Sequence, residues 1–257
     1  MSLATDTNDL LVVSGLSREF GGVHAVVDAS FVVPPARITG LIGPNGAGKS
    51  TVLSMIAGAI RPSSGSITFA GSKVDQLPPY RLARLGVIRT FQIAGVFDRL
   101  TALENLLVGQ SMRGESLRGA LLGKRYWNAE QAMAVDRGRD LLARFDLTDK
   151  ENEYAGSLSG GQKRLLEIAR ALMANPKLLL LDEPMAGVTP SLVHRIEEYL
   201  SALARDGLTM LLVEHSLPVV ERLCDRVVVM AQGSTISTGT MAELRSRREV
   251  LDAYLIG

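Results

Sequence analysis

The sequence has a single cysteine, Cys224, among 257 residues. One thiol excludes an internal disulfide framework and a cysteine-based metal site, and it fits a reducing, cytosolic compartment. Apolar runs long enough to span a bilayer are also lacking, and residues 1–10 lack the basic and apolar segments of a secretory signal. We therefore expect any membrane role of this chain to depend on a partner.

An excess of charge of either sign is lacking as well. The chain carries 28 basic and 27 acidic residues, which gives a formal net charge of +1. Without an overall positive field, we expect no nucleic-acid partner and no direct attraction to anionic lipid. Hydrophobic residues make up 46% of the chain and charged residues 21%, which predicts one large globular domain or a domain with a sizeable insert.

The pattern GxxxxGK[ST] is present at residues 43–50. The apolar segment 38–42 before it predicts a short buried strand, and residues 51–60 after it predict a helix. A strand, a glycine-rich loop and a helix are the context in which this pattern marks a phosphate-binding loop. The alternative is an ordinary glycine-rich turn between a strand and a helix.

The residue types in this loop suit a phosphate group. Glycines let successive backbone N–H groups turn toward an anion, and the following helix offers its unpaired N-terminal donors to the same anion. Lys49 is expected on the β and γ phosphates of a nucleotide, and the Ser50 hydroxyl on a magnesium ion.

Two further positions, one aromatic and one polar, also stand out in the sequence. Apolar clusters over residues 11–33 predict antiparallel strands with a turn at Gly21 and Gly22. Phe20, directly before this turn, fits either a core position or a platform that stacks on a base. Gln92 closes an apolar strand pattern, where capping of the strand end is the alternative to a functional role.

Helix-forming residues predominate from residue 93 to residue 157, which predicts a helical insert inside an α/β domain. The α/β core is then expected over residues 10–92 and 158–240, followed by a C-terminal helix over residues 241–257. Within this scheme, the segment LSGGQ at residues 158–162 opens a helix, so that a second glycine-containing loop leads into a helix N-terminus.

Two further strand ends carry candidate functional groups. The apolar run 178–181 is typical of a central parallel strand, and it ends in Asp182 and Glu183. Ligands bind at the carboxyl edge of such sheets, although an acidic surface turn is the alternative. The next apolar run, 208–213, is followed by His215, which on its own would be an ordinary strand-end histidine.

The order of these motifs resembles the ATP-binding subunit of ABC transporters. A phosphate loop, a strand-end glutamine, LSGGQ, LLLLDEP and a strand-end histidine follow one another, and the resemblance covers nearly the whole chain. It implies an ATPase with a P-loop NTPase core, in which a mixed sheet is combined with an antiparallel β subdomain and a helical subdomain insert. It also implies ATP and Mg²⁺ as cofactors.

The resemblance implies a role for each matched position. Glu183 resembles the general base that polarises the attacking water, His215 the residue that contacts the γ-phosphate, and Gln92 the residue that reaches the metal and this water. Ser50 and Asp182, with Gln92, would organise magnesium. Phe20 falls where the family places an aromatic ring against adenine, and the phosphates would be held by Gly43, Pro44, Asn45, Gly46, Ala47, Gly48, Lys49, Ser50 and Thr51.

The family also implies a head-to-tail dimer. In such a dimer the signature segment of one chain completes the site around the ATP that the phosphate loop of the other chain holds. The signature segment of this chain is Ser159, Gly160, Gly161 and Gln162. The chain departs from many ABC ATPases at Thr189, which stands nearest the place of a usual aspartate. The resemblance therefore leaves cross-talk between the two sites open.

Several short blocks look like the larger ATPase subunit of bacterial branched-chain amino acid importers, namely residues 18–26, 89–92, 104–108, 186–190 and 253–257. This resemblance implies a peripheral protein on the cytoplasmic face of the inner membrane. Its partners would be a different, shorter ATPase subunit, two permeases and, indirectly, a solute-binding protein. Urea or amide importers, lipid or lipopolysaccharide exporters and soluble ATPases of iron–sulfur assembly are the alternatives.

Apolar residues at the start of the insert have two interpretations. They would form the groove for a permease helix, or they would pack inside the insert itself. These residues are Ile93, Val96, Phe97 and Leu100.

Overall fold

The computed structural model describes residues 9–90, 95–110 and 124–256. Contacts between residues divide the chain into two compact units. The α/β unit comprises residues 1–92, 177–186 and 193–257, and the helical unit comprises residues 93–176 and 187–192.

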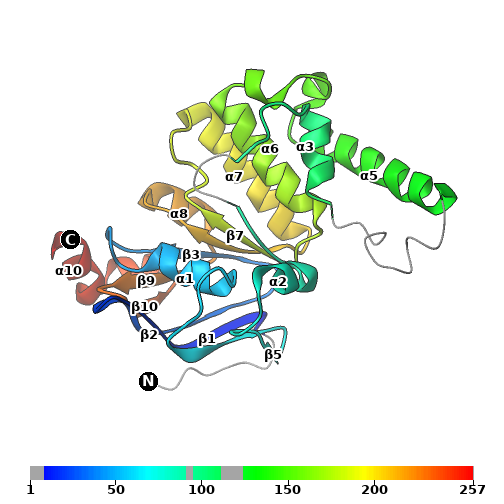
Figure 1. Ribbon diagram of the computed structural model, residues 1–257. Helices are drawn as coiled ribbons and strands as arrows, with labels where there is room; N and C mark the ends of the chain where they lie inside the picture. The colour runs from blue at the N-terminus through cyan, green and yellow to red at the C-terminus, as the bar shows by residue number, and fades with distance from the viewer. Residues whose placement is uncertain (1–8, 91–94, 111–123, 257) are drawn as a thin grey trace. The chain divides into compact units, whose positions relative to one another are not determined.

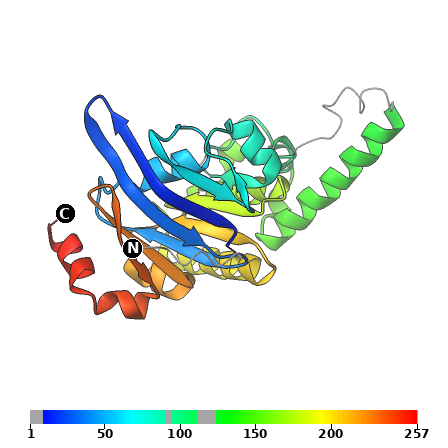
Figure 2. The same cartoon turned by 90° about the horizontal axis from the view of Figure 1, so that it is seen from below.

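An antiparallel sheet in the α/β unit is built around a long hairpin, the pair of blue arrows in Figure 2. Its strands are β1 (Leu11–Phe20) and β2 (Val23–Val33), which pair across a turn of two glycines with φ angles of 52° and 88°. These angles favour glycine, which lacks the Cβ that makes them costly. β1 also pairs with β4 (Ser64–Phe69), and β4 pairs with β5 (Ser72–Lys73). The antiparallel strands and turn expected over residues 11–33 are confirmed.

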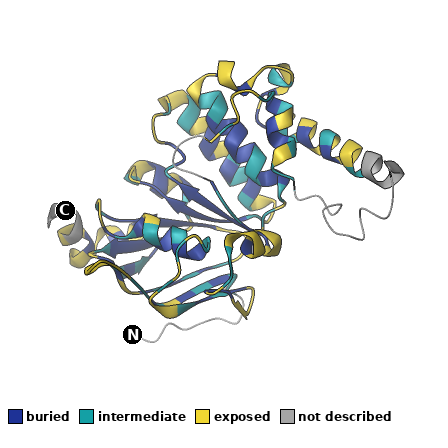
Figure 3. Ribbon diagram, viewed as in Figure 1, coloured by how far each residue is buried: buried dark blue, intermediate teal, exposed yellow. Residues whose placement is uncertain are grey.

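The second sheet of this unit is mixed, and β10 is the strand that runs antiparallel to its neighbour. Its strands lie in the spatial order β10 (Ser234–Gly239), β9 (Arg226–Ala231), β3 (Ile38–Ile42), β8 (Thr209–Val213), β7 (Leu178–Asp182) and β6 (Val87–Arg89). β3, β7 and β8 are buried along their whole length, as the dark blue strands of Figure 3 show. Strands covered on both faces need apolar residues at every position, which explains their continuous apolar runs.

Helices follow the strands of this sheet (Figure 1). Since β3, β7 and β8 are parallel neighbours, their carboxyl ends meet at one edge of the sheet, and the segments that follow them come together there. The helices with residues in the α/β unit are α1 (Lys49–Ile56), α2 (Pro79–Leu85), α7 (Pro190–Arg205), α8 (Leu217–Leu223), α9 (Met241–Arg245) and α10 (Arg248–Ile256).

The helical unit is held together by α6 (Gly160–Met173), which packs against α3 (Ala102–Val108) and α5 (Lys124–Arg144). Its core includes Leu106, Leu142 and Phe145, which have no exposed surface. Two short 3-10 helices at residues 148–150 and 155–157 join α5 to α6.

Two boundaries differ from those expected. The compact helical unit extends to residue 176 instead of ending at 157, because α6 packs on α3 and α5. The helix expected over residues 241–257 is two helices in the described residues, since α9 ends at Arg245, α10 begins at Arg248, and Arg247 between them donates a hydrogen bond to the Ser237 hydroxyl of β10.

The described residues contain no helix that combines the length and the apolar character needed to cross a membrane.

Candidate functional site

The loop between β3 and α1 has a backbone that admits only glycine at two positions. Gly43 has a φ of 149°, and a Cβ there would lie 2.0 Å from the carbonyl oxygen of Met230. Gly48 has a φ of 93°, and a Cβ there would lie 2.5 Å from the carbonyl oxygen of Ala25. The loop thus lies in the predicted context of a buried strand, a glycine-rich turn and a helix.

Lys49, the first residue of α1, turns its ammonium group into this loop. Its Nζ donates hydrogen bonds to the carbonyl oxygens of Gly43 at 2.8 Å and Pro44 at 2.9 Å. Burial lowers the pKa of Lys49, and the negative charges of Glu183 and Asp182 oppose that shift. The loop therefore holds a buried cation that faces two carboxylates from the end of β7.

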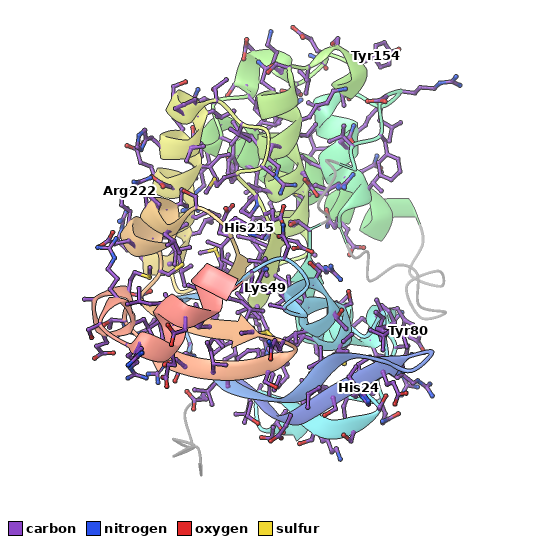
Figure 4. The ribbon with its side chains drawn as sticks, turned by 90° about the vertical axis from the view of Figure 1, so that its left-hand side faces the viewer. His24, Lys49, Tyr80, Tyr154, His215 and Arg222 are labelled. Carbon is purple, nitrogen blue, oxygen red and sulfur yellow. The ribbon has the colours of Figure 1, made fainter. Side chains whose placement is uncertain are left out.

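A cavity of about 400 Å³ opens beside the loop, which is the size of a pocket for a small molecule. Figure 4 labels three of its residues, Lys49, His215 and His24, which come from α1, the segment after β8 and β2. The cavity is lined by Val23, His24, Ala25, Asn45, Gly46, Ala47, Gly48, Lys49, Ser50, Thr51, Glu183 and His215.

Glu183 and His215 meet at this cavity. The Nε2 atom of His215 lies 2.8 Å from Oε1 of Glu183, and both side chains are partly exposed. Glu183 has a φ of 49°, in the left-handed region that non-glycine residues rarely adopt, and its N–H donates to the carbonyl of Val213 at 3.0 Å. Unusual backbone angles of this kind concentrate at functional sites, where the surroundings hold them in place.

Asp182, at the end of β7, is 2% exposed, so the alternative of an acidic surface turn is wrong for this residue. Arg89 from β6 donates through Nη2 to Oδ2 of Asp182 at 2.9 Å and through Nη1 to the hydroxyl of Ser54 at 2.8 Å. Ser54 in turn donates to the carbonyl of Ser50 at 2.6 Å. One arginine therefore connects the carboxylate of Asp182 to the first turn of α1.

A family model described as ABC transporter matches residues 26–186, which include the loop, the LSGGQ segment and the end of β7. The chain belongs to the ABC transporter family. This ABC protein is also 39% identical over 248 residues to the high-affinity branched-chain amino acid transport ATP-binding protein LivG of Salmonella typhimurium, with 96% of the chain and 97% of that protein covered. It is 37% identical over 249 residues to the corresponding protein BraF of Pseudomonas aeruginosa, at 96% and 97% coverage.

Solved structures agree with this assignment. The fold of this ABC protein matches a nucleotide-free ATP-binding cassette from an ABC transporter with a TM-score of 0.82 and 34% identity, covering 96% of this chain and 98% of that one. An ADP conformation of an ATP-binding cassette matches with the same values. The expected ABC ATPase fold, with its mixed sheet, antiparallel sheet and helices, is confirmed.

The oxygen donors of this ABC protein fit magnesium. Ser50 offers a hydroxyl and Asp182 a carboxylate, and the two are joined through Arg89 and Ser54. The residues that the structure describes contain no group of three His, Cys, Asp or Glu side chains able to hold a metal alone. A site with few protein oxygens suits Mg²⁺, which usually takes its remaining ligands from substrate phosphates and water.

Phe20 of this ABC protein is 41% exposed at the end of β1, so the core interpretation of this residue is wrong. The guanidinium carbon of Arg18 lies 4.6 Å from the centre of its ring. Stacking on adenine stays a prediction for Phe20. Sequence analysis missed His24 and its neighbours in the cavity lining, although their position just after the Gly-Gly turn and opposite the end of β1 was a usable signal.

The signature segment of this ABC protein lies in the helical unit and begins α6. Ser159 and Gln162 form a capping box: the Ser159 hydroxyl accepts from the N–H of Gln162 at 3.3 Å, and Oε1 of Gln162 accepts from the N–H of Ser159 at 2.9 Å. A Cβ at Gly161 would lie 2.0 Å from Cδ2 of Leu192, whereas one at Gly160 would meet no atom within 4 Å.

Two of the sequence predictions cannot be placed in this ABC protein. Gln92 and Ile93 lie outside the described residues.

Proposed function

We propose that this chain binds and hydrolyses ATP, and that hydrolysis drives import of branched-chain amino acids through membrane permeases. The observation that carries the proposal is the cavity in which the glycine loop, Lys49, Glu183 and His215 come together. The loop supplies backbone N–H groups and a helix N-terminus, and Lys49 supplies positive charge, for the phosphate chain of a nucleotide.

Hydrolysis requires a water molecule to attack the γ-phosphorus as the bond to the ADP oxygen breaks. Glu183 would accept a proton from this water, since its carboxylate faces the cavity and lies next to the phosphate loop. His215, which contacts Glu183 at 2.8 Å, would fix the orientation of the carboxylate and reach the γ-phosphate. Lys49 would stabilise the charge that develops on the phosphate oxygens.

A bound magnesium ion would supply charge neutralisation at the phosphates. Ser50 and Asp182 are the residues that would hold it, and Arg89 fixes the direction in which the Asp182 carboxylate points.

The relatives named above support the transport role, because LivG and BraF are both named as ATP-binding proteins of branched-chain amino acid transport. For this chain we propose a second ATPase subunit and two permeases as partners, at the cytoplasmic face of the membrane. In the helical unit, Phe97 is 48% exposed and lies beside Arg170, so it presents an apolar surface that a permease helix could cover.

The test of hydrolysis is the Glu183→Gln variant, which removes the base and keeps the size of the side chain. We expect ATP turnover by the purified chain to fall about a hundredfold, the scale for loss of a general base, while nucleotide binding is retained. Glu221→Gln on α8, an exposed residue paired with Arg245, is the matched control and should keep full activity. Undiminished turnover in Glu183→Gln would refute the role of Glu183.

The test of the transported substrate uses the same variant in cells that lack the wild-type chain. We expect wild type to restore uptake of labelled leucine, isoleucine and valine, and Glu183→Gln to leave it at background. Restored uptake of urea or an amide, with none of these amino acids, would overturn the substrate proposal and leave the ATPase proposal intact.

A further inference from the structure

Glu214 is a buried acid that the mechanism above does not use. It follows β8 directly, it precedes His215, and it is only 5% exposed. Burial raises the pKa of Glu214, the N–H groups of Met185, His215 and Ser216 oppose this shift, and the nearby charge of Glu183 adds to it. A buried acid needs hydrogen bonds that offset the cost of its burial. The donors to Glu214 therefore indicate which segments of the chain this side chain connects.

The carboxylate of Glu214 connects two loops of the site. Oε1 accepts a hydrogen bond from the N–H of Met185 at 3.0 Å, and Oε2 accepts one from the N–H of His215 at 3.2 Å. Met185 lies two residues after Glu183, so one side chain spans from the turn that carries Glu183 to the turn that carries His215. Hydrogen bonds to a charged acceptor are stronger than neutral ones, which suits a fixed connection.

The backbone of Glu183 is therefore held from two directions. Its own N–H donates to the carbonyl of Val213, the residue before Glu214, at 3.0 Å. The N–H of Met185 donates to the Glu214 side chain, and the N–H of Ala186 closes a turn by donating to the carbonyl of Glu183 at 3.1 Å. Since Glu183 has a φ of 49°, its conformation needs such external support.

We infer that Glu214 is a positioning residue for hydrolysis: its carboxylate holds the turns of Glu183 and His215 in the register that brings their side chains together. This inference rests on the proposed ATPase function and adds a residue that is not part of the cavity lining. Glu214 also couples the turn after Glu183 to the turn of His215, because the N–H groups of Met185 and His215 both donate to its carboxylate.

The experiment compares wild type, Glu214→Gln and the control Glu221→Gln in ATP turnover and nucleotide binding. An amide keeps the shape of the side chain, but its NH₂ group cannot accept a hydrogen bond, so one of the two turns is released. We expect kcat to fall between about tenfold and a hundredfold, the scale for a small misplacement of a catalytic group, with the Kd for ATP unchanged within about twofold. Glu221→Gln should match wild type.

A combined variant separates positioning from loss of general stability. We assume that Glu214 acts through the contact of His215 with Glu183. The Glu214→Gln substitution should then lower kcat by a smaller factor in the His215→Ala variant than in wild type. Equal, additive losses, or an unchanged kcat in folded Glu214→Gln, would overturn the inference. Should Glu214→Gln not fold, Glu214→Asp keeps the charge, shortens the reach, and is expected to give the same fall in kcat at unchanged Kd.

Glu183→Gln is measured in the same assay so that two failures can be told apart. Full turnover in Glu183→Gln would remove the proposed function and the inference together. Loss of turnover in Glu183→Gln with full turnover in Glu214→Gln would remove only the inference about Glu214.

Discussion

Replacing Arg89 with methionine tests the network behind the end of β7. The arginine side chain is 19% exposed and its partner Asp182 is 2% exposed, with 2.9 Å between Nη2 and Oδ2. Methionine fills a similar length with apolar atoms but leaves the Asp182 carboxylate without this cation, and it leaves the Ser54 hydroxyl without its donor at 2.8 Å. The substitution therefore removes charge and hydrogen bonds with little change in volume.

The expected loss of stability follows from the burial of the pair. Removing one partner of a buried ion pair costs about 3–5 kcal/mol, and the remaining exposure of Arg89 places the cost at the lower end, about 3 kcal/mol. For a chain of this size each kcal/mol lowers Tm by about 2–4 °C, so we expect a fall of about 6–12 °C. Arg37→Met, which breaks an exposed pair with Asp225, is the control and should cost about 1 kcal/mol or less.

Thermal unfolding followed by circular dichroism measures both changes. Adding Asp182→Asn to Arg89→Met removes the charge that the first substitution leaves buried, so we expect the double variant to unfold at a higher temperature than Arg89→Met alone. A Tm for Arg89→Met no lower than that of Arg37→Met would refute the reasoning. So would a double variant in which the two losses simply add.

Further outcomes are expected at Lys49, Cys224 and Phe97. Lys49→Ala should abolish binding of a fluorescent ATP analogue in equilibrium titration, and an unchanged affinity would contradict the phosphate-loop proposal. Burial raises the pKa of Cys224 from 9.0 to about 12, so the reactive thiolate is scarcer in the folded chain and a thiol reagent at pH 8 should react more slowly with the folded than with the unfolded chain. The same shift contributes stability that is present below pH 9 and is lost as the pH rises toward 12, and equal reaction rates would exclude it. Phe97→Glu should prevent co-purification of permeases from membranes and spare ATP turnover by the isolated chain, whereas intact co-purification would favour internal packing of Phe97.

The buried strands and the glycine loop could be predicted because their signals are local in the sequence. Residues 38–42 and 178–181 read as apolar runs and lie in the strands β3 and β7, and the run 208–213 includes the whole of β8. All three are parallel strands that are covered on both faces. The strand β10 and the helix α8 are among the elements that were missed, because their sequences carry a weak local signal. β10 is rich in serine and threonine and has no apolar run, and α8 is only seven residues long.

The contacts inside the site could not be predicted from local patterns. Arg89 and Asp182 are 93 positions apart, and Glu214 and Met185 are 29 apart. The contact of Arg89 with Asp182 depends on the parallel register of β6 and β7, which pairs Arg89 with Leu180. The contact of Glu214 with Met185 depends on the register of β7 and β8, which pairs Asp182 with Val213 and so brings the residues after both strands to the same place. Sequence periodicity tells which positions are buried, but the partner of a polar side chain is set by strand order and register.

The two hydrogen bonds from Lys49 to backbone carbonyls affect how a ligand can enter and leave the site. Moving its ammonium from the oxygens of Gly43 and Pro44 to those of a phosphate exchanges one set of acceptors for another. The buried cation has acceptors in both states, so neither arrival nor departure of a ligand requires a bare charge in the interior. The loop can then pass through repeated cycles as a small local rearrangement, without unfolding the end of α1 each time.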